Sequence, residues 1–355
     1  MDILILGGTG AMGVPLVDLL AKNKENDLYV TSRTKYMDRE NVKYLRGNAK
    51  DNTFLNSVLS RNYDVIVDFM VYGTNEFQNR LDLLLDHTKQ YFFFSSARCY
   101  AGSKERIKES SSRLVDICED PKYLATDEYG LAKGREEDLL KKSEHNNWTI
   151  IRPYITYNSQ RVQLGVYEKE NWIRRALAGR TVVLPKDIAD RKTSLTYGPD
   201  VAGAIVELIG NEKAFGEAFH ITTQESYTWK DILDFYCKII YENTGKKVKV
   251  KIVEDSKGLQ KVWNKWQIIY DRLYDREFDN SKIEAVRGKY DYKPIFEGLN
   301  ECLTEFLKEP KWLKMNWPYE AWCDSVAGEM TPLKDIEGMR NKLIYIKWRF
   351  FMKYE

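Results

Sequence analysis

Short runs of apolar residues alternate with helix-forming segments through the first half of the chain. The run DVIVDFM (64–70) is continuous and β-branched, as is typical of a strand buried on both faces. Helical patterns separate such runs, and this alternation predicts a parallel sheet wound on both faces. The predicted strands span residues 3–6, 28–32, 42–48, 64–70, 91–96 and 148–154, and the first helix spans roughly 12–23. We therefore predict an α/β fold with a Rossmann-type doubly wound parallel sheet.

The pattern loosens from about residue 160. Residues 177–185 predict a strand outside the main sheet, and residues 199–210 predict a helix ended by Gly210. A further strand at 218–222 and a long helix at 228–245, opened by a threonine cap, follow. Such segments suit a smaller domain that closes over a ligand.

These patterns predict three parts of the chain. A Rossmann domain covers residues 1–160, and the chain returns to it near 192–215. An interleaved, substrate-binding domain covers 161–300, and a helical C-terminal extension covers 301–355.

Composition narrows the class of protein. With 55 Lys and Arg against 53 Asp and Glu, the chain lacks the basic excess of a phosphate-backbone binder, so nucleic acid is not expected. No apolar run is long enough to cross a bilayer, and the apolar N-terminus reads as a strand rather than a signal peptide. The five cysteines are scattered without a CxxC pair, which favours reduced thiols in a cytoplasm. The three histidines are far apart in sequence, so no metal site is expected.

The segment GGTGAMG (7–13) follows the first predicted strand directly and opens the first helix. Gly7 permits a tight turn, Gly10 lets a pyrophosphate approach the backbone, and Gly13 lets helix and strand pack closely. The helix N-terminus adds N–H groups and positive dipole. The alternative is a plain glycine-rich turn. The segment predicts a dinucleotide site with contacts from Gly7, Thr9, Gly10, Ala11, Met12 and Gly13.

The end of the second strand predicts which dinucleotide binds. An acidic residue is expected there for the ribose of NAD, but this chain has Ser32 and Arg33. A serine and a guanidinium would bind a 2′-phosphate, so we predict NADP(H) over NAD(H). Alternatively, Arg33 stacks on the adenine or faces solvent. Asn48 is placed to hydrogen-bond the adenine edge, although Asn after Gly is also common turn chemistry.

Two further segments predict the reacting end of the site. SSARCY (95–100) ends the fifth strand, at the edge where open α/β sheets bind ligands, and Ser96 is the hydroxyl expected to face the site. YGLAK (129–133) opens a helix, so Tyr129 and Lys133 share a face directed toward Ser96. Tyr129 would exchange a proton with the substrate oxygen during hydride transfer, and Ser96 would hydrogen-bond that oxygen. Lys133 would support Tyr129 electrostatically and bind the nicotinamide ribose.

A rival pair has the same spacing. Tyr100 and Lys104 straddle Gly102 in a loop just past the fifth strand. Their side chains need not point together, so we favour Tyr129 and Lys133.

GGTGAMG, SSARCY and YGLAK, in that order and spacing, resemble the extended short-chain dehydrogenase/reductase family. More narrowly, they resemble its NAD(P)-dependent sugar-nucleotide epimerases, dehydratases and reductases. The resemblance covers roughly residues 1–300. It implies an enzyme of carbohydrate biosynthesis that transfers hydride on a nucleotide-activated sugar, and a homodimer formed through two helices per subunit.

Looser matches imply further contacts. IRPYITYN (151–158) resembles the segment that reaches the nicotinamide and the substrate, which implies contacts from Pro153 and Asn158. RKTSLTYGPDVAGAI (191–205) resembles the segment that carries a substrate-phosphate arginine, here Arg191. FDNSKI (278–283) resembles a late motif of the substrate domain. Next to the strand-five serine, Arg98 is a further predicted substrate contact.

The chain also departs from the family's pattern. The 4,6-dehydratases carry an Asp-Glu pair after the strand-five hydroxyl residue, whereas this chain has Ala97, Arg98 and Cys99, so dehydration is not expected. The GDP-fucose synthase type has a cysteine directly after the second serine; here that residue is Ala97, and Cys99 is interpreted as a small buried residue. Asn158 replaces the glycine usual in its segment.

A competing likeness leads to a different function. The first motif with TSR, and YFFFSSARCY, also resemble an atypical branch that includes chloroplast stem-loop RNA-binding proteins. Members of that branch tend to lose the Tyr–Lys pair, so its retention favours an enzyme. The alternative is a non-catalytic NAD(P)-sensing or RNA-binding protein on the same fold.

The final segment, NKLIYIKWRFFMKYE (341–355), mixes bulky apolar residues with Lys and Arg. We favour a terminal helix packed on the substrate domain or on a dimer mate. Contact with an anionic membrane surface, or with a partner, is the alternative.

Overall fold

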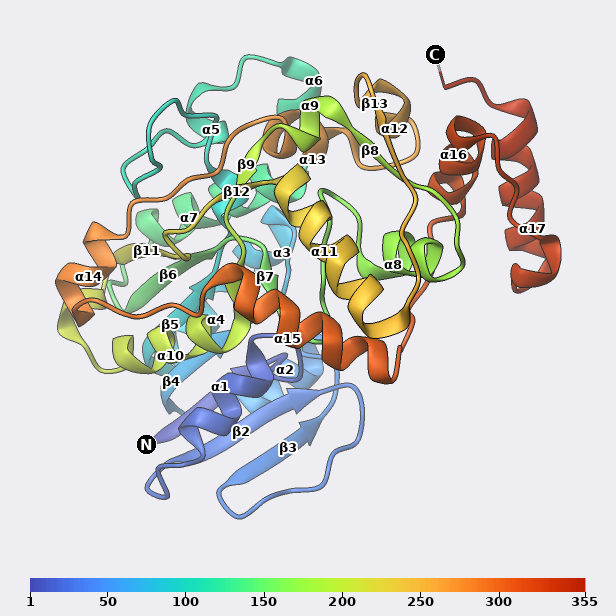
Figure 1. Ribbon diagram of the computed structural model, residues 1–355. Coiled ribbons are helices and arrows are strands. Elements are labelled where there is room, and N and C mark those ends of the chain that lie inside the picture. Colours follow the sequence, from blue (N-terminus) through green and yellow to red (C-terminus); the bar gives the residue numbers. More distant parts are fainter. Residues whose placement is uncertain (355) are drawn as a thin grey trace.

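The computed structural model describes residues 1–354, and a seven-stranded parallel sheet forms its centre (Figure 1). The strand order is β11-β6-β5-β4-β1-β2-β3, and every neighbouring pair is parallel. The strands are β1 (Asp2–Leu6), β2 (Asp27–Ser32), β3 (Val42–Arg46), β4 (Tyr63–Asp68), β5 (Thr88–Phe94), β6 (Trp148–Pro153) and β11 (Glu217–Ile221). The predicted Rossmann-type fold is confirmed.

Helices cover both faces of this sheet, which explains why its strands are apolar at consecutive positions. Ile3 and Ile5 pack on one face with α1 (Gly13–Leu20) and α10 (Gly198–Leu208). Leu4 and Leu6 point to the opposite face, because successive side chains of a strand alternate. The helices on that face are α2 (Asn52–Val58), α3 (Thr74–Gln78), α4 (Leu81–Asp86) and α7 (Tyr129–Lys142).

The strand expected at residues 218–222 lies in the main sheet rather than in a smaller domain. It forms β11, where Phe219 pairs with Ile151 of β6. The preceding helix α10 packs against α1, so residues 198–221 complete the central layers. An edge position on a parallel sheet is not readable from a short apolar run.

A second apolar core lies beside the sheet and includes the buried Trp172 and Trp229. As predicted for residues 177–185, a strand forms there outside the main sheet: β8 (Val182–Pro185) pairs with β13 (Val250–Val253). Its principal helices are α8 (Lys169–Leu177), α11 (Trp229–Thr244) and α15 (Ile295–Lys308). The Thr228 side chain caps α11, and Gly245 ends it with a φ of +67°. The predicted domain boundaries stay a prediction.

The remaining elements are short. The strands are β7 (Thr156–Tyr157), β9 (Lys192–Thr193), β10 (Thr196–Tyr197) and β12 (Tyr227–Thr228). The helices are α5 (Leu114–Ile117), α6 (Pro121–Leu124), α9 (Lys186–Ala189), α12 (Lys257–Gln260), α13 (Lys265–Gln267) and α14 (Ser281–Arg287). Single turns also form at Ala97–Cys99, Glu212–Ala214, Ile268–Arg272 and Leu333–Asp335.

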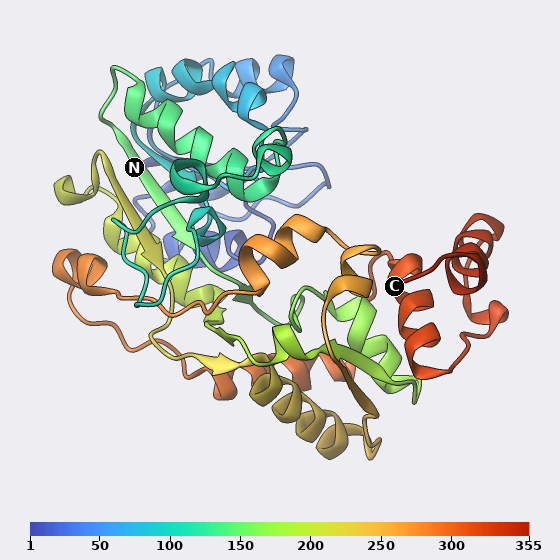
Figure 2. The same ribbon diagram turned by 90° about the horizontal axis from the view of Figure 1, so that it is seen from above.

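The C-terminal helices lie at the outer edge of the molecule, away from the N-terminal strands (Figure 2). They are α16 (Trp317–Ala327) and α17 (Met339–Ile346), which continues as a π-helical turn over Lys347–Phe351. Within residues 1–354, no helix combines the length and apolar character needed to span a lipid bilayer.

Candidate active site

A cleft of about 530 Å³ opens at the carboxyl ends of β1, β4, β5 and β6. The edge beside the central strand β1 is where open α/β sheets bind ligands, because the helix connections diverge there. The predicted site residues that line this cleft are Gly7, Gly10, Ala11, Met12, Gly13, Ser96, Arg98, Tyr129 and Pro153. The structure therefore brings the glycine turn and the two predicted catalytic hydroxyls together.

The three glycines of the turn differ in their surroundings. Gly7 has a φ of +71° and its N–H donates to Thr31 Oγ1 at 2.9 Å. A Cβ on Gly13 would lie 2.6 Å from the carbonyl of Gly8, so helix α1 could not pack as it does. A Cβ on Gly10 would meet no atom within 4 Å. The backbone at Gly10 is thus open to a ligand, whereas Gly7 and Gly13 are needed by the fold.

Local hydrogen bonds and an ion pair hold Ser96, Arg98 and Tyr129 in the cleft. Ser96 Oγ accepts the Arg98 N–H at 3.2 Å, which caps the turn Ala97–Cys99. Glu128 caps α7, so Tyr129 is the first residue of that helix. The Arg98 guanidinium pairs with Glu128 at 2.6 Å and lies 5.2 Å from the centroid of the Tyr129 ring. Ser96, Arg98 and Tyr129 are consequently tied to one another through the start of α7.

Lys133 lies beneath the cleft rather than on its lining. Its Nζ is buried, 2.8 Å from Glu136 Oε2 and 5.9 Å from the centroid of the Tyr129 ring. Burial raises the pKa of Glu136 to about 7, against the opposing effect of Lys133. Within the described residues, Glu136 Oε1 has no hydrogen-bond partner. The ammonium that was predicted to bind a ribose is therefore paired with a carboxyl group in this structure.

The rival pair, Tyr100 and Lys104, does not face the cleft. Tyr100 is fully buried, its Oη accepts from Arg152 at 2.8 Å, and burial holds its pKa far above the usual range. Lys104 is exposed on the loop. Cys99 is also fully buried, and burial raises the pKa of its thiol to about 12, as expected of a small core residue.

The residues predicted to bind the adenosine end lie outside the cleft. Ser32 is buried and its Oγ accepts the Thr34 N–H at 3.1 Å. Arg33 is exposed, and within residues 1–354 its guanidinium forms no hydrogen bond or ion pair. Asn48 is exposed and its Oδ1 accepts the Lys50 N–H at 3.2 Å, as in a local turn. Of these three residues, Arg33 is the one with a charged side chain that is exposed and has no ion-pair partner within residues 1–354.

Two predicted substrate contacts also lie elsewhere. Asn158 donates to the Ala11 carbonyl at 3.4 Å and, together with Thr9, lines a neighbouring cavity of about 690 Å³. This cavity shares Gly10, Ala11 and Arg161 with the cleft. Arg191 lines neither space, and its carbonyl accepts the Trp229 N–H at 3.1 Å at the start of α11. Arg191 is placed by its backbone at a junction of elements, and its side chain does not enter the cleft.

Other side chains line the cleft without having been predicted, namely Arg161, Gln163, Gln267 and Arg272. Arg272 is buried, pairs with Asp271 and donates from Nε to the Gly165 carbonyl at 2.9 Å. Arg161 is half-exposed and lies 3.5 Å from Glu168. Together with Arg98 they make three arginines, and among the described residues no Asp or Glu lines the cleft. This arrangement suits an anionic ligand.

Backbone strain is also found at this cleft. Ile155 has a φ of +31° and is the one non-glycine residue among residues 1–354 with a positive φ. That conformation is costly for a β-branched residue, and such strain tends to gather at functional sites. Ile155 lines the cleft between Tyr154 and Thr156.

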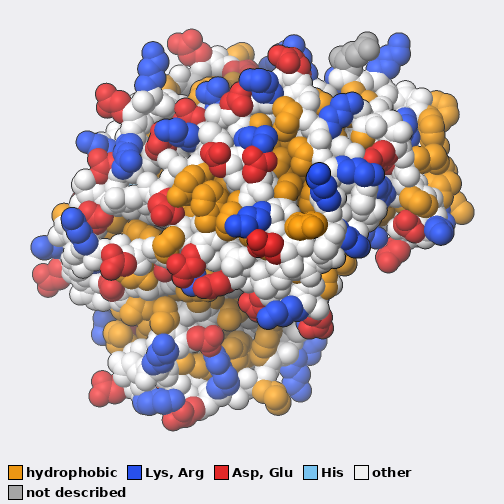
Figure 3. Space-filling model, in the orientation of Figure 1, with side chains coloured by type: hydrophobic (Ala, Val, Ile, Leu, Met, Phe, Trp, Pro, Cys, Tyr) orange, Lys and Arg blue, Asp and Glu red, His pale blue; other side chains and the backbone are white. Residues whose placement is uncertain are grey.

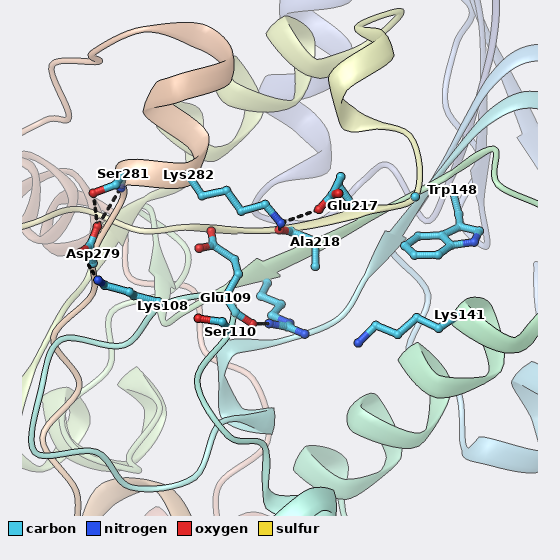
Figure 4. Close-up of a pocket in the computed structure, with 12 residues that line it drawn as sticks. Lys108, Glu109, Ser110, Lys141, Trp148, Glu217, Ala218, Asp279, Ser281 and Lys282 are labelled. Atoms are coloured by element: carbon cyan, nitrogen blue, oxygen red, sulfur yellow. Dashed lines mark hydrogen bonds and ion pairs between the residues drawn. The ribbon is translucent and has the colours of Figure 1, made fainter.

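A third cavity, of about 420 Å³, lies beside the edge strand β11 (Figure 4). Four of its charged residues form two ion pairs: Lys282 lies 2.6 Å from Glu217, and Lys108 lies 3.6 Å from Asp279. It contains none of the predicted site residues. The cleft at the glycine turn is therefore the candidate active site.

Comparison with known proteins begins with the sequence. No family model matches the chain. A curated relative, the chloroplast stem-loop binding protein of 41 kDa b from Arabidopsis thaliana, is 29% identical over 244 residues. The match covers 64% of this chain and spans only 60% of that relative's length.

Solved structures with the same fold align over most of the chain. WbmH from Bordetella bronchiseptica, in complex with NAD+, has a TM-score of 0.67 and 14% identity over 87% of this chain and 99% of its own. dTDP-glucose 4,6-dehydratase from Bacillus anthracis, with NAD, has a TM-score of 0.67 and 17% identity over 88% and 98%. UDP-glucuronic acid 4-epimerase from Bacillus cereus, with UDP-glucuronic acid and NAD, has a TM-score of 0.67 and 17% identity over 88% and 100%. The fold expected from the resemblance to extended short-chain dehydrogenase/reductases is confirmed.

Proposed function

We propose that this protein binds a nicotinamide dinucleotide along the glycine turn and acts on a nucleotide-activated sugar by hydride transfer. One observation carries the proposal: a single cleft contains the turn, Ser96, Tyr129 and three arginines. The likeness to structures that contain NAD, one of them with UDP-glucuronic acid, supports it.

The residues present fit a dinucleotide. The open space at Gly10 admits a pyrophosphate to the backbone at the start of α1, where N–H groups and helix dipole attract anions. Gly7, Ala11 and Met12 would hold it from the turn, and Pro153 from the end of β6. When bound, the nicotinamide supplies a hydride donor or acceptor.

Tyr129 is the proposed acid and base. Its phenol would take a proton from a substrate hydroxyl, or give one to a carbonyl oxygen, while Ser96 hydrogen-bonds the same oxygen. Arg98 and Lys133 lie 5.2 and 5.9 Å from the ring centroid, where they would stabilise negative charge that develops on the phenol. We assign Lys133 this electrostatic role. A ribose contact would require its ammonium to leave Glu136.

The substrate end favours a diphosphate-linked sugar. Arg161 and Arg272 come from segments beyond the sheet and reach the same cleft as Tyr129. Guanidinium groups bind phosphate with paired, charge-assisted hydrogen bonds. No carboxylate lines the cleft within the described residues, so elimination of water lacks the carboxylate base that it would need besides Tyr129. Epimerisation or net reduction is therefore favoured over dehydration.

The exposed Arg33 supports a preference for NADP(H). Its guanidinium has no partner within residues 1–354, and Arg46 lies opposite Ser32 on the neighbouring strand β3. Replacing Arg33 by Asp should cut NADPH affinity about tenfold and leave NADH affinity little changed, since only NADPH carries the 2′-phosphate. Fluorescence titration measures both. Equal losses for the two cofactors would remove the preference.

The first test is mass spectrometry of small molecules released from the denatured protein, with NADPH and NADH titrations alongside. Tightly held NAD would indicate an epimerase that recycles its cofactor, and would contradict the NADP(H) preference. An empty protein that binds NADPH far better than NADH would indicate a reductase. Binding of neither would refute the proposed function. Light scattering would test the homodimer that the resemblance implies.

An RNA-binding role is the second candidate, because the curated relative is a stem-loop binding protein. A gel shift with structured RNA that weakens steeply with salt would support it. The near-balance of 55 basic and 53 acidic residues argues against it.

A further inference from the structure

Exposed apolar side chains gather on the outer side of the C-terminal helix. Met339, Leu343, Phe350 and Phe351 are 70%, 59%, 56% and 77% exposed. Figure 3 shows hydrophobic atoms at the surface where α17 lies in Figure 1. Met339 and Leu343 are four apart in α17 and share one side of it, and Phe350 and Phe351 follow in the π-helical turn. We call these four residues the tail patch.

The opposite side of α17 packs against the rest of the protein. Tyr345 is buried and its Oη donates to Asp324 of α16 at 2.7 Å. Ile344, Ile346 and Trp348 pack against the buried Trp317 and its neighbours. The favoured expectation of a packed terminal helix therefore describes the inner side only. The tail patch contributes nothing to this packing, and large exposed apolar groups of this kind mark interaction surfaces.

Positive charge predominates around the tail patch, although the exposed Asp335 and Glu337 directly precede it. Residues 338–353 include the cations Arg340, Lys342, Lys347, Arg349 and Lys353 and no Asp or Glu, although the chain as a whole is nearly neutral. Within residues 1–354, Arg340, Lys342 and Lys347 form no ion pair. Their charge is available to an external anion.

We propose that the tail patch and its cations form a peripheral binding surface for an anionic lipid bilayer. The phenyl, leucine and methionine side chains would enter the boundary between headgroups and acyl chains, while Arg340, Lys342 and Lys347 reach lipid phosphates. The charge complementarity favours this ligand over a second copy of the chain, because two copies would bring like charges together.

The test is flotation of the full chain with vesicles of phosphatidylcholine alone or mixed with phosphatidylserine. Binding should require phosphatidylserine and weaken with salt, because unshielded charges provide the attraction. Replacing Phe350 and Phe351 by Ser should weaken binding at least tenfold, since their buried area is lost. Replacing Arg340, Lys342 and Lys347 by Glu should weaken it by roughly a hundredfold.

Matched control variants distinguish binding through the tail patch from non-specific binding by other exposed residues. Met37 and Leu313 are 87% and 76% exposed elsewhere, and replacing both by Ser should leave vesicle binding unchanged. Lys22 and Lys104 are exposed cations away from the tail, and replacing both by Glu should also change it little. Point variants are preferred to deletion, because deletion would uncover Trp317.

Three outcomes would overturn the proposal. The first is no flotation with phosphatidylserine vesicles. The second is equal binding by tail variants and controls. The third is that the tail patch mediates binding to structured RNA, or self-association measured by light scattering, and the protein does not bind vesicles. Circular dichroism of each variant would confirm that the fold is intact, since the substituted side chains lie outside the packed side of α17.

Discussion

The two ends of the candidate cleft are built differently. The phosphate end consists of backbone: Gly7 turns the chain, Gly10 leaves space and Gly13 permits contact with Gly8. The substrate end consists of side chains from distant segments, such as Arg161 and Arg272. A backbone site is encoded by residues adjacent in sequence, whereas a side-chain site depends on how separate segments fold together. Four experiments probe the cleft, and two of them, at Arg161 and at the glycines, test whether its two ends respond differently to substitution.

Tyr129→Phe should have the largest effect. It removes the proton-transfer group and should lower turnover by about two to four orders of magnitude, with dinucleotide binding unchanged. Turnover would be measured on the nucleotide sugar identified from a substrate panel, and binding by NADPH and NADH fluorescence. Tyr100→Phe is the matched control, because Tyr100 belongs to the rival pair and its hydroxyl makes only buried hydrogen bonds, with Arg152 and His220. Comparable turnover in the two variants would remove Tyr129 from its role.

Glu136→Gln tests the buried pair beneath Tyr129. The pKa of Glu136 is about 7 in the folded chain against an ordinary value of 4.5, so the folded state holds this proton more tightly. Its stabilising effect is complete below pH 4.5 and is lost as pH rises through the folded pKa of about 7. The wild type should therefore lose about 3 kcal/mol of unfolding free energy across this window relative to the variant. Urea titration at both ends of the window measures this, and parallel pH profiles would contradict it.

The difference between sites built from adjacent residues and sites built from distant ones also explains how much of this protein could be predicted from its sequence. The sheet could be predicted because strands such as β4 are rich in apolar, β-branched residues. The glycine turn could be predicted because its glycines lie within seven consecutive residues. Arg272 was not readable, since nothing near it distinguishes a cleft arginine from a surface one. The pairing of Lys133 with Glu136 was missed because it depends on burial of both groups, although their spacing of three is visible in the sequence.

Arg161→Gln should weaken nucleotide-sugar binding about ten- to hundredfold, because one charge-assisted contact to phosphate is lost. Arg161 is half-exposed, so the unfolding free energy should change little. Arg191→Gln is the matched variant, since Arg191 lies outside the cleft despite its sequence match. Calorimetric titration with a nucleoside diphosphate sugar would compare them. A larger loss in the Arg191 variant would reverse the assignment made from the structure.

Gly10→Ala and Gly13→Ala distinguish an effect on dinucleotide binding from an effect on stability, both at the end of the cleft proposed to bind phosphate. A methyl group on Gly10 meets no protein atom within 4 Å, so the fold should tolerate it, but it occupies the space proposed for the pyrophosphate. Dinucleotide affinity should fall about tenfold at unchanged thermal stability, the cost of one poorly placed methyl group. On Gly13 the same methyl group would lie 2.6 Å from the Gly8 carbonyl, so stability should fall by about 1–3 kcal/mol. If Gly10→Ala lowered stability without weakening NADPH binding, Gly10 would serve the fold alone, and the contrast between a backbone-built end and a side-chain-built end of the cleft would no longer hold.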